Sequence, residues 1–104
     1  MAKYLFIYHG GAKPENQEDG KKAMAAWMEW FESIGDKVID GGNPVGLSTT
    51  VMSDGNVVRD GGTNPAGGYS LFEAKDVEEA ISMAKGCPIL AAGGSIELAE
   101  TFDP

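Results

Sequence analysis

The sequence has little cysteine, little histidine and little positive charge. Its 104 residues include one cysteine, Cys87, and one histidine, His9. A single cysteine allows no intramolecular disulfide and favours a reducing compartment. One histidine and one cysteine do not make a typical zinc site, so we expect no metal. The phosphate-binding motifs G-x-x-x-x-G-K-[ST] and G-x-G-x-x-G are absent, so we expect no nucleotide cofactor and no other cofactor.

The eight Lys and Arg residues are outnumbered by sixteen Asp and Glu residues, which gives a net charge of −8. The basic residues are scattered along the chain. Nucleic acids and anionic membranes both require basic patches, so we expect neither as a partner.

Long hydrophobic runs are also absent. The apolar segment near the N-terminus is too short for a signal peptide or a membrane span, and we therefore expect a cytoplasmic protein. The length corresponds to one domain, residues 1–104, with a single core. Fifteen glycines, many of them in adjacent pairs, separate short secondary-structure elements.

The segment Gly68–Pro88, GYSLFEAKDVEEAISMAKGCP, carries the clearest local signal. A β-prone run is followed by Asp76, which can cap a helix, and by Glu79, which can complete a capping box. Apolar residues then recur at the spacing of one helix face. Gly86 and Pro88 are typical of a helix end. This pattern predicts a strand, a capped turn and a helix.

The remaining elements follow from periodicity and turn signals. A first helix is predicted to end at Ile34, with Asn16 or Asp19 as N-cap and with Met24, Trp27, Met28 and Phe31 on its buried stripe and Trp30 at the edge. Asp54-Gly55 predicts a hairpin. Residues 61–68 are predicted to be a loop and residues 89–94 a turn. The predicted strands are residues 3–9, residues 38–39, residues 47–52 and 56–59 of the hairpin, residues 69–72, and residues 95–102 with Ile96, Leu98 and Phe102 on one side.

The order β-α-β-β-α-β is that of an α+β, ferredoxin-like fold, with an antiparallel sheet and both helices on one face. Two helices cover one face only. The other face carries either the Tyr4, Phe6, Tyr8 set or the Leu5, Ile7 set of the first strand. Exposing a few hundred Å² of such surface costs roughly 5–10 kcal/mol at about 25 cal/mol per Å². We therefore predict a homodimer through the open sheet face; the alternative is a monomer with an open hydrophobic cleft.

Nearly the whole chain resembles the YCII-related (DGPF-domain-like) family. The resemblance is carried by KYLFIYHG, AMAAWMEWFESIGD, VIDGGNP, GYSLFEAKDVEEAISMAKGCP and SIELAETFD. It implies a dimeric α/β-barrel fold. It also implies possible enzymatic activity, since some members resemble dehydrochlorinases that use a His–Asp pair, while others occur beside regulatory proteins.

The chain departs from the family pattern at three places. Met24 occupies the position of a first-helix histidine in members thought to be catalytic. Only Asp60-Gly61 remains of the Asp-Gly-Pro-Phe motif of one branch. Cys87 stands where another branch often has a histidine. The resemblance therefore implies the fold and leaves the catalytic residues open.

Three residues are candidates for acid–base chemistry. His9 ends the first strand beside two glycines, and its imidazole can exchange protons near neutral pH. Glu97 is expected to face the open side of the sheet, where it can act as a base with His9. Asp60, with Asp40 as a weaker alternative, can orient His9. The structural alternatives are a strand-terminal histidine, a polar contact across the dimer interface for Glu97, and a turn residue for Asp60.

Tyr8, Trp27 and Trp30 are candidates for a ligand-binding wall. At helical spacing Trp27 also fits the core, whereas Trp30 is expected to be more open.

These residues favour a small dimeric protein that binds a small organic ligand in a cavity between the sheet and the first helix. One alternative is a dehydrochlorinase-like lyase or isomerase that uses His9 with a carboxylate. The other is a regulatory or structural partner protein. A closed pocket with His9 within hydrogen-bond reach of a carboxylate would favour the enzyme, whereas His9 in bulk solvent with no pocket nearby would exclude it.

Overall fold

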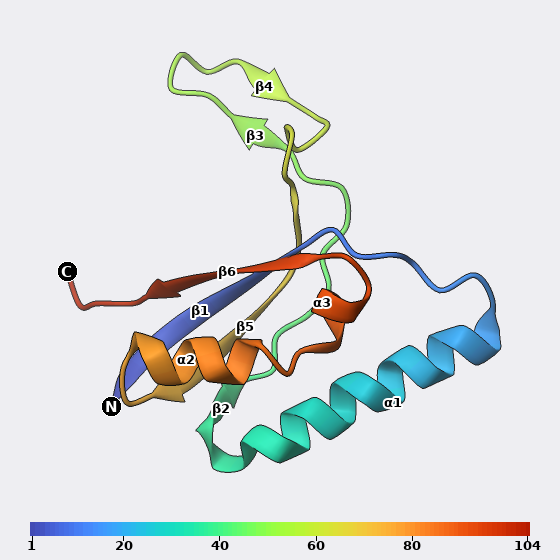
Figure 1. Ribbon diagram of the computed structural model, residues 1–104. Helices are drawn as coiled ribbons and strands as arrows, with labels where there is room; N and C mark the ends of the chain where they lie inside the picture. The colour runs from blue at the N-terminus through green and yellow to red at the C-terminus, as the bar shows by residue number, and fades with distance from the viewer.

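The chain folds into a four-stranded antiparallel sheet with its long helices on one face (Figure 1). The computed structural model describes all residues from 1 to 104. The strand order β2-β5-β1-β6 is that of the ferredoxin-like fold, which confirms the predicted α+β class. In chain order the elements are β1 (Ala2–His9), α1 (Gln17–Ile34), the short 3-10 helix η1 (Gly35–Lys37), β2 (Val38–Asp40), β3 (Thr50–Val51), β4 (Val57–Val58), β5 (Ala66–Ala74), α2 (Val77–Ala84), α3 (Pro88–Ala91) and β6 (Ser95–Glu100).

The predicted helix starts are confirmed. The side chain of Asn16 accepts a hydrogen bond from the Asp19 amide at 2.8 Å, and that of Asp76 accepts one from the Glu79 amide at 2.9 Å. These bonds satisfy amides that the first turn of a helix leaves without a partner. The Glu79 carboxylate reaches back to the amide of Lys75, one residue before the capping Asp76.

The core between sheet and helices is aromatic. Phe6 of β1 and Phe72 of β5 are fully buried, with ring centroids 4.5 Å apart. Trp30 of α1 packs on Phe72 with centroids 5.4 Å apart, and its indole N–H donates to the backbone oxygen of Met83 at 2.9 Å. Trp30 thus joins α1 to both the sheet and α2.

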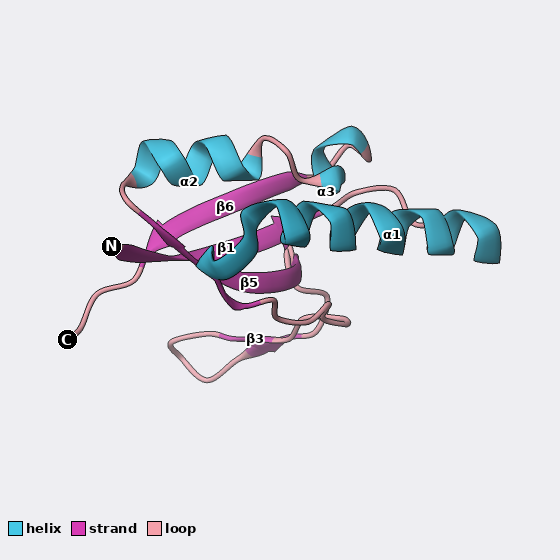
Figure 2. Cartoon of the chain, turned by 90° about the horizontal axis from the view of Figure 1, so that it is seen from below, coloured by secondary structure: helices cyan, strands magenta, loops and turns pink.

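The predicted buried stripe of α1 is wrong in part. Trp30 is 6% exposed, whereas Met24 and Met28 are 67% and 58% exposed. Figure 2 shows that the N-terminal part of α1 extends beyond the sheet, so side chains there have no layer to pack against. Near its C-terminal end α1 packs on the sheet. The side of the helix that is buried there carries Trp30.

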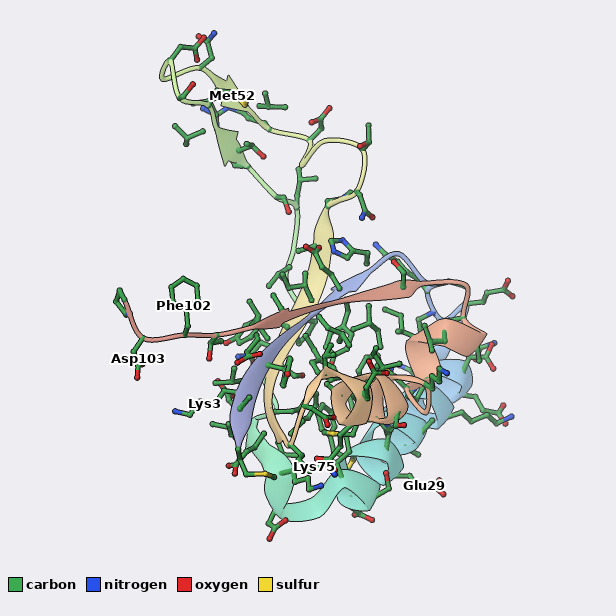
Figure 3. All side chains as sticks on the ribbon, turned by 60° about the vertical axis from the view of Figure 1, so that its left-hand side comes forward. Lys3, Glu29, Met52, Lys75, Phe102 and Asp103 are labelled. Atoms are coloured by element: carbon green, nitrogen blue, oxygen red, sulfur yellow. The ribbon has the colours of Figure 1, made fainter.

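Several other boundaries differ from the prediction. The hairpin strands are shorter than predicted, since β3 covers Thr50–Val51 and β4 covers Val57–Val58. Strand β5 begins at Ala66, inside the segment predicted to be a loop. Residues 88–91 form α3, where the sequence predicted only a turn; Pro88 occupies the first turn, where its missing N–H costs nothing. Strand β6 ends at Glu100, and Phe102 is 85% exposed beyond it (Figure 3).

Of the two sets of side chains on the first strand, the Leu5, Ile7 set lies on the open face of the sheet. Tyr4, Phe6 and Tyr8 face the helices and are buried. Leu5 and Ile7 lie on the opposite face, where Leu5 pairs with Leu71 and Ile7 with Tyr69 across the β1–β5 ladder. On the other side of β1, Leu5 pairs with Ala99 and Ile7 with Glu97. We call the set Leu5, Ile7, Tyr69, Leu71 and Ala99 the open face.

No helix has both the length and the apolar composition needed to cross a membrane.

Candidate functional site

His9 lies at the end of β1, at a register shift between Tyr8 and His9 in the ladder with β5. Its side chain is only 8% exposed. Gly94 permits the close packing here, because a Cβ atom on it would lie 2.6 Å from both the His9 carbonyl oxygen and a side-chain carbon of Ile89. The local backbone therefore holds His9 in a fixed position.

Both ring nitrogens of His9 face oxygen atoms. Nδ1 lies 3.1 Å from the backbone oxygen of Pro65, and Nε2 lies 2.9 Å from Oε1 of Glu97. A carbonyl oxygen only accepts hydrogen bonds, so Nδ1 carries a proton. In a neutral ring Nε2 would then be an acceptor facing a second acceptor. The geometry therefore requires one further proton between His9 and Glu97.

The electrostatics agree with this assignment. The hydrogen bond to Glu97 raises the pKa of His9 above 6.5, the contact with the Pro65 carbonyl adds to the rise, and burial opposes it. The raised pKa favours the imidazolium form of His9 beside the Glu97 carboxylate. The Glu97 side chain is 61% exposed, so the pair joins a buried group to one that a solute can reach.

The structure brings His9 and Glu97 together and leaves Asp60 apart from them. The Asp60 carboxylate accepts from the amide of Gly62 at 3.0 Å, and that of Asp40 accepts from Gly42 at 2.8 Å. Both are turn contacts of the kind aspartate often makes. The group that orients His9 is instead the carbonyl of Pro65, which the sequence analysis missed because a backbone oxygen leaves no residue-type signal.

Tyr8, Trp27 and Trp30 lie together in the core. The Tyr8 ring packs edge-on against Trp27 with centroids 4.9 Å apart, and Trp27 against Trp30 at 5.7 Å. The Tyr8 hydroxyl donates to Ser70 Oγ at 2.8 Å, and that hydroxyl donates to the Gly41 carbonyl at 2.6 Å. Burial raises the pKa of Tyr8. These rings fill the space between the sheet and the C-terminal part of α1.

Trp30 is the more buried tryptophan, contrary to the prediction that it is the more open one. Its edge borders a groove of about 320 Å³ between α1 and α2. The groove is lined by Trp30, Ser33, Ile34, Lys37, Ser82, Met83 and Gly86.

The chain has no cluster of side chains typical of a metal site, and its one thiol is buried. No group of three or more His, Cys, Asp or Glu side chains is placed to hold a metal ion. Cys87 is buried, and its burial raises the pKa of the thiol to about 11, so it remains protonated at neutral pH.

No protein-family model matches the chain, and no curated protein matches it. A solved structure, the 5-chloro-2-hydroxyhydroquinone dehydrochlorinase (TftG) from Burkholderia phenoliruptrix AC1100 in complex with 2,5-dihydroxybenzoquinone, is similar in fold. The TM-score is 0.56 and the sequence identity 19%, over 96% of this chain and 95% of that chain. At this identity the likeness establishes the fold alone.

Proposed function

We propose that this chain is a YCII-related protein that forms a homodimer, binds a small organic molecule beside His9 and Glu97, and acts on it by acid–base catalysis, as a lyase or isomerase. The observation that carries the proposal is the proton that the geometry requires between His9 Nε2 and Glu97 Oε1. A single acid–base pair can remove a proton from one atom of a ligand and return it at another. Such chemistry needs no cofactor.

The two residues have different roles in this scheme. Glu97 is exposed and is the group that meets the ligand. His9 is buried, is fixed through Nδ1 by Pro65, and exchanges the proton with Glu97 through Nε2. Met24, which replaces the histidine of related proteins on the first helix, is 67% exposed and has no acid–base group. His9 and Glu97 therefore perform the proton transfer without it.

The dimer follows from the open face. Glu97 pairs with Ile7 in the sheet, so its side chain lies on the same side as Leu5 and Leu71. A second sheet packed on this face would give the His9–Glu97 pair a second wall and reduce its contact with water. The single cysteine, which allows no intramolecular disulfide, supports the expected cytoplasmic location.

The ligand class is a hydroxylated aromatic or quinoid acid. The fold likeness to a dehydrochlorinase solved with 2,5-dihydroxybenzoquinone supports this choice. Acidic hydroxyl groups on a planar ring can exchange a proton with the pair, and the ring can lie on the apolar residues beside Glu97.

The experiment is a binding titration with 2,5-dihydroxybenzoquinone and related hydroxylated aromatic acids. Calorimetry and thermal shift measure the binding. We expect the wild type and Asp60→Asn to bind alike, and His9→Gln and Glu97→Gln to bind at least about 10-fold more weakly, which corresponds to about 1.4 kcal/mol. Deuterium from the solvent appearing at a ring carbon of the ligand, faster with the wild type than with either variant or without protein, would demonstrate proton transfer; NMR detects it, and hydroxyl protons are not counted because they exchange with water without a catalyst.

The remaining outcomes separate the alternatives. Binding without deuterium exchange would leave a ligand-binding protein without turnover. If no compound of this class binds, or if the two variants bind as well as the wild type, the catalytic proposal fails and a regulatory or structural role is favoured.

A further inference from the structure

Residues 45–58, which we call the arm, form a hairpin that stands apart from the rest of the chain. Strands β3 and β4 pair with each other through Thr50–Val58 and Val51–Val57 and with no strand of the main sheet. The Asp54 carboxylate accepts hydrogen bonds from the backbone and side chain of Asn56, so the turn is well formed. The arm is thus a defined structural element.

The arm is unusually apolar for an element with so little to pack against. The chain has thirteen large hydrophobic residues that are exposed, and six of them lie in these fourteen positions. Leu47 is 82% exposed and Val51 69%. Isolated two-stranded hairpins are at best marginally stable in water, and exposed apolar clusters typically mark contact surfaces. The six are Val45, Leu47, Val51, Met52, Val57 and Val58.

The body of the same chain does not cover the arm. The radius of gyration is 14.9 Å, while a compact chain of this length has about 13 Å. Figures 1 and 3 show the hairpin, with Met52 labelled in Figure 3, projecting beyond the end of the main sheet. The apolar side chains of the arm are therefore accessible to another molecule.

The arm projects toward the side on which the open face lies. In Figure 2 the hairpin lies below the sheet, on the opposite side from α2. The start of the arm, and the segment that leads from it into β5, are both tied to the end of the sheet that carries His9. The Val45 amide donates to the Gly67 carbonyl at 3.1 Å, and the Pro65 carbonyl accepts from His9. The arm and the open face are thus two separate apolar surfaces that lie on the same side of the molecule.

The size of this surface fits contact with a second copy of the chain. A stable interface takes about twenty to thirty residues from each side, and the outward positions of β1, β5 and β6 supply only about a dozen. The fourteen residues of the arm raise the total to the size required. We propose that the arm of each subunit packs against a second copy of the chain, beside the sheet-to-sheet contact, and closes the His9–Glu97 site from the side. This inference rests on the homodimer proposed above.

The experiment measures dimer dissociation by analytical ultracentrifugation for a double variant of the arm, Leu47→Lys with Val51→Lys. The matched control is Met24→Lys with Met28→Lys, which adds the same charge at two methionines of α1 that are similarly exposed. A third variant, Leu71→Lys, disrupts the open face itself. We expect the dissociation constant of the arm variant to rise at least about 10-fold, because charged groups replace buried apolar ones, while the control dimerises like the wild type.

Hydrogen exchange on the wild type provides a second measurement that needs no variant. The amides of the arm should become more protected as the protein concentration rises through the dimer dissociation constant. Amides in the exposed N-terminal part of α1 should not change.

The outcomes distinguish the two proposals. If the wild type and the arm variant dimerise equally while Leu71→Lys dissociates, the open-face dimer stands and the role of the arm is overturned. If the wild type is a monomer at high concentration, the homodimer itself is overturned and the arm proposal with it. Unchanged protection of the arm across the concentration range also overturns its role.

Discussion

Replacing Glu97 by glutamine tests whether His9 is held as a cation. The side chains have nearly the same shape, but the amide carries no charge and can donate a hydrogen bond. In the variant, neutral His9 keeps its Nδ1 proton on the Pro65 carbonyl and accepts from the new amide at Nε2. Every polar atom therefore keeps a partner, and only the ionic character of the contact is lost.

The size of the effect follows from the exposure of the two groups. A hydrogen bond to a charged group contributes about 1.5–3 kcal/mol, and a neutral one about 1 kcal/mol. The side chain of His9 is 8% exposed but that of Glu97 is 61% exposed, so solvent screening reduces the ionic gain. We therefore expect Glu97→Gln to lower the free energy of unfolding by about 1 kcal/mol at pH 6.

The pH dependence has a definite sign. Glu97 raises the pKa of His9 above its ordinary value of 6.5. A raised pKa in the folded state stabilises the protein fully below the unfolded value and progressively less as pH rises through the folded value. The stability advantage of the wild type over Glu97→Gln should therefore be present at pH 6 and fall as the pH rises through the folded-state pKa of His9.

Two measurements test this prediction. NMR titration of the His9 ring protons gives its pKa in each protein, and it should be higher in the wild type. Urea denaturation at several pH values gives the stability difference. The interpretation is refuted if His9 titrates at the same pH in both proteins, or if the stability difference grows as the pH rises above 6.5. Asp60→Asn is the control, since Asp60 makes only a turn contact.

Two further predictions concern the core beneath the site. Ser70→Ala should destabilise the protein by about 2 kcal/mol, since it leaves the buried Tyr8 hydroxyl without its acceptor, whereas Tyr8→Phe should cost only about 1 kcal/mol because Ser70 keeps its bond to Gly41. Equal costs in urea denaturation would contradict this hydrogen-bond order. Phe72→Ala, at a fully buried position against Phe6, should cost about 3–5 kcal/mol in the same assay, and a loss below 1 kcal/mol would mean that the aromatic core is not packed as described.

Local patterns determined much of the fold. Asp76 and Asn16 cap their helices as predicted, and Gly35 with its positive φ of 71° ends α1. Capping and periodicity depend on residues a few positions apart, so they can be predicted from the sequence. The element order then restricts the topology to one common arrangement, and this placed His9 and Glu97 on the same side of neighbouring strands.

Other features were decided only by tertiary packing. The face of α1 that is buried depends on how the helix crosses the sheet, which is why Trp30 rather than Met24 or Met28 enters the core. The partner of His9 Nδ1 is a backbone oxygen 56 residues away along the chain, and such a contact has no local sequence pattern. The sequence alone thus determined the elements and their order, because these depend on neighbouring residues. The tertiary structure determined which side chains are buried and how the histidine is protonated, because these depend on groups that only the folded chain brings together.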